Sequence, residues 1–91
     1  MLLSICVESN NRLRDYSTLE PAIAGLGEAR QVVRWTWLLH PRVPDMTAVV
    51  ATVRQHIDND IDRLFVAEIT GRRLDGWLRR DLWDWANDNN N

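Results

Sequence analysis

The sequence predicts an α+β fold: a split βαβ antiparallel sheet with two helices on one face, followed by a C-terminal helix. Three observations lead to this prediction. Residues 2–8, 30–40 and 63–70 are rich in apolar, β-branched and aromatic side chains, which is typical of strands. Two amphipathic stretches lie between them, at residues 15–27 and 45–57. The connections are short, and short connections in this order favour a split βαβ unit.

The three predicted strands differ in pattern. The first ends at one carboxylate, Glu8, while residues 63–70 are mostly apolar, so we expect the last strand to be central and covered on at least one face. The middle segment lacks the Asn-Gly or Gly-Gly pair of a tight hairpin. It can be one long strand, or two strands with a sharp bend near Arg34 and Trp35.

The predicted helices have recognisable starts. Asp15 or Ser17 can cap the first helix, and Gly27 supplies its stop. Asp45 or Thr47 can cap the second. Both helices carry apolar side chains at spacings of three and four, namely Leu19, Ile23 and Leu26 in the first and Met46, Val49, Val50, Val53 and Ile57 in the second.

Helical spacing returns in residues 74–85, in front of a polar C-terminus. We therefore predict a single domain over residues 1–86 and a flexible polar tail over residues 87–91. The chain has 91 residues, of which 45% are hydrophobic and 26% charged. A domain of this size has a thin core and gains much from pairing with a second copy, so a homodimer is expected.

Net charge and cysteine content bear on where the protein is located and what it binds. The formal net charge of -2 gives no general attraction to nucleic acid or to an anionic membrane. The single cysteine, Cys6, cannot form an internal disulfide and reads as a small buried hydrophobe. The sequence contains neither a secretory leader pattern nor a run of eighteen apolar residues. We expect a cytoplasmic protein with no membrane partner.

Short motifs within residues 1–70 form a recognisable set. The first strand ends in an acidic residue followed by asparagine, and a tyrosine, Tyr16, lies eight positions after Glu8. Leu26-Gly27, Trp35-Thr36-Trp37-Leu38-Leu39, and Ile57-Asp58 leading to Asp62-Arg63-Leu64-Phe65-Val66 complete the set. The chain thereby resembles the SinR-like small proteins of the Cas-two-like group, which contains CRISPR-associated proteins and virulence-associated D toxins.

The resemblance implies a ferredoxin-like fold, a sharp bend at residues 34–36, a homodimer and a protein partner such as an antitoxin. In that group the first strand ends in aspartate, and two such residues across the dimer axis are thought to hold a divalent cation for phosphodiester hydrolysis. Here the matching residue is Glu8, whose extra methylene displaces the carboxylate and weakens the inference. Alternatively, Glu8 binds amides of the following loop or pairs with Arg12 or Arg14.

Two tryptophans could form a nucleic-acid site. Trp35 and Trp37 are two residues apart on a predicted strand and so point to one face, where they could stack on bases beside Arg30 and Arg34. The alternative is that both belong to the core or to the dimer interface. In the terminal helix, the tryptophans at positions 77 and 85 lie on the apolar stripe, so we expect Trp77 and Trp85 to pack on the sheet or at the dimer interface.

The acidic loop before the last strand resembles the start of a calcium loop. Asp58, Asp60 and Asp62 alternate as its oxygen ligands do. Arg63 stands where that motif needs glycine, and Ile69 where it needs glutamate. We therefore reject an EF-hand and expect a solvated turn in which Asp62 braces Arg63 or a nearby amide.

Three function classes follow. The first is a small homodimeric interaction or regulatory protein without catalysis, linked to CRISPR or toxin–antitoxin systems. The second is a metal-dependent endonuclease that uses paired Glu8 carboxylates and Mg²⁺ or Mn²⁺. The third is a noncatalytic nucleic-acid binder. The scarcity of catalytic side chains and the negative charge favour the first class, for which we expect no cofactor and only weak nucleic-acid binding.

Overall fold

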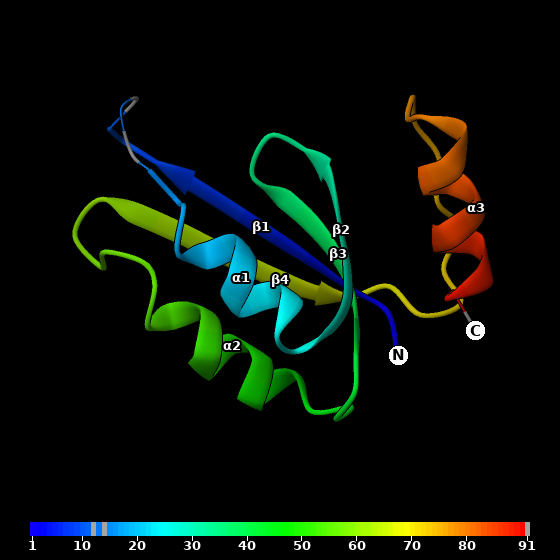
Figure 1. The fold of residues 1–91 in the computed structure, drawn as a ribbon, viewed down its shortest axis with the longest axis horizontal. Coiled ribbons are helices and arrows are strands. Elements are labelled where there is room, and N and C mark those ends of the chain that lie inside the picture. The colour runs from blue at the N-terminus through cyan, green and yellow to red at the C-terminus, as the bar shows by residue number, and fades with distance from the viewer. Residues whose placement is uncertain (12, 14, 91) are drawn as a thin grey trace.

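The computed structural model describes residues 1–11, 13 and 15–90. Its elements follow the order β1 (Leu3–Ser9), α1 (Leu19–Ala24), β2 (Gly27–Val33), β3 (Thr36–Pro41), α2 (Met46–Arg54), β4 (Asp62–Glu68) and α3 (Arg80–Asp88) (Figure 1). It is an α+β fold with one antiparallel sheet of four strands. Within the described ranges, no helix has the length and apolar character needed to cross a bilayer.

The sheet has the strand order β2-β3-β1-β4. Residues 30–40 are therefore not one long strand: the chain bends at Arg34 and Trp35, and β2 pairs with β3 up to Val33 opposite Thr36. The position of β4 corrects a second prediction, because β4 is an edge strand rather than a central one. Its apolar run arises because α2 covers one face of the strand, while Phe65 on the other face stays exposed.

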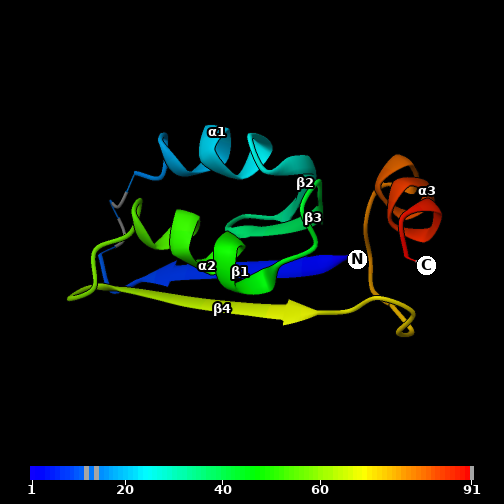
Figure 2. The same cartoon turned by 90° about the horizontal axis from the view of Figure 1, so that it is seen from below.

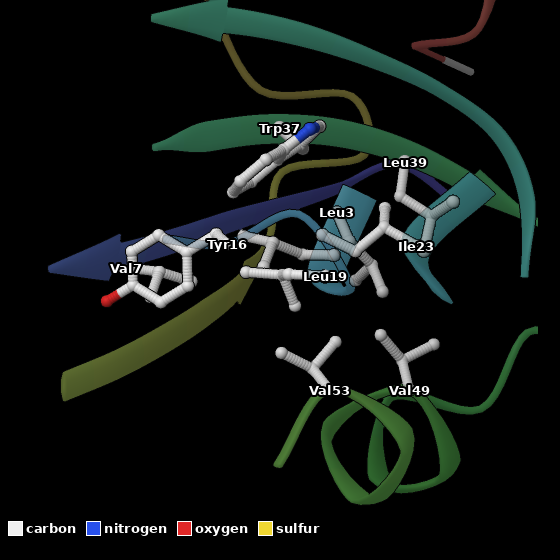
Figure 3. Close-up of a cluster of buried hydrophobic side chains, with 10 residues drawn as sticks. Leu3, Val7, Tyr16, Leu19, Ile23, Trp37, Leu39, Val49 and Val53 are labelled. Carbon is white, nitrogen blue, oxygen red and sulfur yellow. The ribbon is translucent and has the colours of Figure 1, made fainter. Parts of the chain in front are cut away.

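Helices α1 and α2 lie on the same side of the sheet (Figure 2). The main core fills the space between these helices and the sheet, and it is built from alternate strand residues and the helix stripes (Figure 3). Its buried members are Leu3, Ile5, Val7, Tyr16, Leu19, Ile23, Trp37, Leu39, Val49 and Val53. Four residues of the predicted stripes, Leu19, Ile23, Val49 and Val53, thus form the inner faces of the two helices. Met46 is exposed instead, and Leu26 and Ile57 lie beyond the helix ends, where they pack against the core.

The residues that begin and end the helices agree only in part with those predicted from the sequence. Asp45 caps α2 by accepting a hydrogen bond from the Ala48 amide at 3.2 Å. Asp15 instead accepts from the Ser17 amide, while the N-cap of α1 is Thr18, which makes no side-chain capping bond. Gly27 does not stop α1, which ends at Ala24; it opens β2 instead.

The terminal helix begins later than predicted. Residues 71–79 form an irregular connection in which Gly71 and Gly76 adopt positive φ angles of 71° and 150°, so helical spacing there does not produce a helix. Helix α3 lies beyond the end of the sheet where β1 begins and β4 ends (Figure 2). A second small core joins Ala86 of α3 to Leu2 and Leu38.

The polar C-terminus is tied to the preceding connection. Helix α3 continues to Asp88, two residues beyond the predicted domain end at residue 86. The Asn90 side chain then accepts a hydrogen bond from the Gly71 amide and donates one to the Arg72 carbonyl, at 2.8 and 2.9 Å. The described part of the tail is therefore bonded to the domain.

Candidate functional site

The face of the sheet opposite α1 and α2 carries the side chains that the helices do not cover. We call this surface the open face and define it by Cys6, Glu8, Thr36, Arg63 and Phe65. These residues meet in register, because Cys6 lies between Thr36 and Phe65, and Glu8 lies opposite Arg63. They line a shallow hollow of about 410 Å³. Helix α3 covers another part of the sheet, where Ala86 packs on Leu2 and Leu38.

Glu8 projects from the end of β1 and pairs with a neighbouring strand. Its Oε1 lies 3.8 Å from Nε of Arg63, and the two side chains are 76% and 74% exposed. The pairing with Arg12 or Arg14 that we considered falls outside the described residues. Among the residues that the structure describes, no three His, Cys, Asp or Glu side chains gather as a metal site would require. Within the described part of one copy, Glu8 therefore belongs to no such group.

Phe65 is the largest apolar side chain on the open face and is 67% exposed. Cys6 lies beside it and is half-buried rather than fully buried as predicted; its Sγ lies 3.6 Å from Oγ of Ser4. An exposed aromatic ring flanked by a charged pair is typical of a surface that contacts another protein.

The acidic loop before β4 is a structural turn. Asp62 is buried, and its Oδ1 accepts a hydrogen bond from the Tyr16 hydroxyl at 3.0 Å. Its Oδ2 accepts from the Asp58 amide at 2.7 Å, and Asp58 in turn accepts from the Asp60 amide at 2.9 Å. These bonds place Asp62 against a neighbouring amide, one of the two roles that we predicted, and connect the start of β4 to the segment before α1.

The predicted nucleic-acid residues do not form one platform. Trp37 is 2% exposed inside the main core, which corrects its assignment both to base stacking and to the dimer interface. Trp35 is half-buried and packs edge-on against Tyr16, with ring centroids 4.7 Å apart. Arg34 lies over the Trp35 ring at 5.4 Å. Trp35 and Trp37 are unavailable for base stacking because helices α1 and α2 cover the face of the sheet to which both indole rings point.

The other predicted residues lie near α3. Arg30 is exposed, and its guanidinium carbon lies 5.0 Å from the centre of the Trp85 ring. Trp85 packs against the second small core and donates from Nε1 to Glu28 at 3.2 Å, so it holds α3 to β2 within one chain. Trp77 is 99% exposed because it precedes α3 instead of lying on its apolar stripe.

A second hollow lies between α2 and the outer edge of β4, with a volume of about 470 Å³. We call it the β4 groove. Its apolar lining is Met46, Val50, Ile57, Leu64 and Val66, and Arg54 and Asp62 supply charge.

Sequence reasoning missed Phe65 and the β4 groove. The run Arg63-Leu64-Phe65-Val66 shows no alternation of apolar with polar residues, so the pattern gave no sign that Phe65 faces away from the core. Only the charged residue at each end of the strand, Asp62 and Glu68, hinted at an exposed edge.

Comparison with known proteins adds no assignment: no family model, curated protein or solved structure matches this chain.

Proposed function

We propose that this chain is a homodimeric protein-interaction module of Cas-two-like, ferredoxin-like architecture, without catalysis of its own. The element order and the strand order β2-β3-β1-β4 support the ferredoxin-like assignment. The short motifs described above support the assignment to the SinR-like proteins and a role beside CRISPR or toxin–antitoxin components, with a protein partner such as an antitoxin.

The observation that carries this function is the open face. Phe65 exposes two thirds of its surface next to Cys6 and Thr36, and Glu8 and Arg63 flank it with opposite charges. Apolar area beside a mixed-charge rim suits contact with a protein, because protein interfaces combine an apolar centre with a polar border. This surface suits nucleic acid less well, because the negatively charged phosphates of nucleic acid bind to patches of positive charge.

The experiment that tests the homodimer is sedimentation at micromolar concentration. We expect a mass near twice the chain's 10.6 kDa. A mass equal to that of one chain across this range would contradict the homodimer. Incubation of the same preparation with RNA and DNA in Mg²⁺ or Mn²⁺ tests the absence of catalysis, and we expect no cleavage above that of a matched blank purification.

The nuclease alternative depends on Glu8 alone. The Glu8 carboxylate is exposed and its ion pair with Arg63 is long, so it is accessible to the Glu8 carboxylate of a second copy. Two Glu8 carboxylates would have to lie within one cation's coordination distance, and the geometry of the dimer therefore decides this alternative.

A further inference from the structure

The two edges of the sheet are protected to different degrees. At β2 the register shifts between Gln31 and Val33, and Glu28 and Arg30 contact Trp85 of α3. At β4 an unbroken register of seven residues runs from Asp62 to Glu68, with no proline and no bulge. In the described part of the chain, no strand pairs with the outer side of β4. A long regular edge of this kind is a template for pairing with another strand.

The orientation of the β4 backbone follows from its neighbours. The Ile61 carbonyl accepts from the Asn10 amide and the Ile69 amide donates to the Leu2 carbonyl, so these odd-numbered residues turn their polar groups towards β1. Antiparallel strands alternate in this respect. The amide and carbonyl groups of Leu64 and Val66 therefore point outward, where a second strand can bond to them.

The β4 groove lies directly beside these outward groups. Leu64 and Val66 line it from the strand, and Met46 and Val50 line it from α2. All four are incompletely buried in the single chain. A strand added at this edge would cover them, so backbone pairing and apolar burial favour the same docking position.

We propose that a second copy of this chain docks there: two β4 strands pair antiparallel across a two-fold axis at Phe65 and join the two sheets into one of eight strands. In this register Phe65 faces its counterpart on the open face, and Leu64 faces Val66 of the other copy in the groove. A shift by two residues in either direction would instead place Val66 opposite Asp62, or Leu64 opposite Glu68.

Arg54 offsets the one unfavourable charge contact of this register. Each Glu68 lies opposite Asp62 of the other copy, and two carboxylates in that position repel each other; Arg54 lines the same groove as Asp62. Asp62 already accepts bonds from Tyr16 and Asp58, whereas the structure places no carboxylate on Arg54 among the described residues. Arg54 is therefore the group with which the incoming Glu68 forms an ion pair. To do so, Glu68 gives up the hydrogen bond that it accepts from the Thr70 hydroxyl. The two-fold axis provides this contact twice.

This dimer also bears on the nuclease alternative. Two β1 strands would be separated by both β4 strands, and three strand spacings amount to about 14 Å. Two Glu8 carboxylates on such a sheet cannot share one cation. The open faces would instead lie side by side and double the surface offered to a protein partner. The inference deepens the proposed homodimer and rests on it.

Disulfide trapping tests the axis. In a non-hydrogen-bonded antiparallel pair the two Cα atoms lie about 4.5 Å apart, within disulfide range. Phe65→Cys should therefore give a covalent dimer on mild oxidation. The background must be Cys6→Ser, because Cys6 lies opposite Phe65 in the same chain. Val33→Cys in that background is the matched control, since Val33 is 55% exposed and lies on β2.

Charge exchange tests the register. We expect Arg54→Glu to raise the dimer dissociation constant roughly tenfold, because Glu68 and Asp62 then lack their cation, and the added change Glu68→Arg to restore it. Thermal melting of each variant reports whether the fold is intact. A double variant that dissociates as readily as Arg54→Glu alone would overturn this register.

The outcomes separate this inference from the function on which it rests. If the parent chain sediments as a dimer and Phe65→Cys crosslinks no faster than Val33→Cys, the β4 edge is not the interface, although the homodimer stands. If the parent chain sediments as a monomer, both proposals fall. Faster trapping at Phe65, together with rescue by the charge exchange, supports the edge-paired dimer.

Discussion

At the scale of single residues, two carboxylates that look alike in the sequence have different environments. Glu8 lies on the open face with one long ion pair, whereas Asp62 is buried and accepts hydrogen bonds on both oxygens. An exposed ion pair contributes little to stability because water competes for both groups, while a buried acceptor is costly to leave without its donors. The two residues should therefore respond differently to the same isosteric change.

Glu8→Gln removes the charge and keeps the shape. We expect the free energy of unfolding to fall by at most about 1 kcal/mol, because the ion pair with Arg63 is exposed. Denaturant titration measures this change. Metal-dependent cleavage by the parent chain that disappears in Glu8→Gln at an unchanged melting temperature would refute the noncatalytic proposal and favour the endonuclease.

Asp62→Asn should destabilise the protein by about 1–3 kcal/mol, because its amide group cannot accept from both Tyr16 and Asp58. Tyr16→Phe should lower stability as well, and the effects of the two changes should not add, since both remove the same bond. Asp60→Asn is the control on the same loop, where the side chain is exposed. Equal melting temperatures for Asp62→Asn and Asp60→Asn would contradict this role.

At the scale of elements, the β2–β3 hairpin depends on close contact between its strands. A Cβ on Gly27 would lie 2.2 Å from the His40 carbonyl oxygen and 2.8 Å from Cα of Pro41. Both atoms belong to the backbone and cannot move without separating the strands. Gly25, two residues earlier, has ordinary space and a φ of -68°, close to helical values. The two glycines thus serve different purposes.

Gly27→Ala should lower the free energy of unfolding by about 1–3 kcal/mol, as overpacking does in a tight site. Gly25→Ala should leave stability unchanged or raise it by about 0.4–1 kcal/mol, because alanine fits the native backbone there and restricts the unfolded chain. Chemical denaturation of the two variants side by side gives both values. Similar losses in the two variants would show that the close approach at Gly27 is not the cause.

At the scale of the whole molecule, the two arginines predicted to bind nucleic acid do not form one platform. Arg30 lies over Trp85 and Arg34 over Trp35, at separate places in the fold, and the net charge is -2. Apolar side chains are exposed on the open face at Phe65, in the β4 groove at Met46, and elsewhere at Val33, Val43 and Trp77. The overall distribution of charge and apolar area therefore favours a protein partner over a polyanion.

Binding to nucleic acid should accordingly be weak and sensitive to salt, because the net charge of -2 opposes it and only local arginines can displace counterions. Titration of labelled single-stranded and duplex RNA and DNA checks this expectation. Nanomolar binding that persists at about 200 mM salt would contradict it and would support the nucleic-acid binder.

The sequence by itself determined the α+β class, the helix stripes and the acidic turn. Apolar residues at spacings of three and four identified the buried faces of α1 and α2, and Asp45 identified the start of α2. These features follow from local periodicity and capping, which depend on residues close together in the chain.

Only the tertiary structure decided which strands lie at the edges and which aromatic rings are buried. The apolar run of β4 suits a central strand equally well, and nothing local distinguishes Trp37 in the core from the fully exposed Trp77. Strand neighbours and helix cover depend on contacts between segments that are far apart in the sequence. For that reason the open face and the β4 groove, on which the proposed function rests, could be found only after the chain was folded.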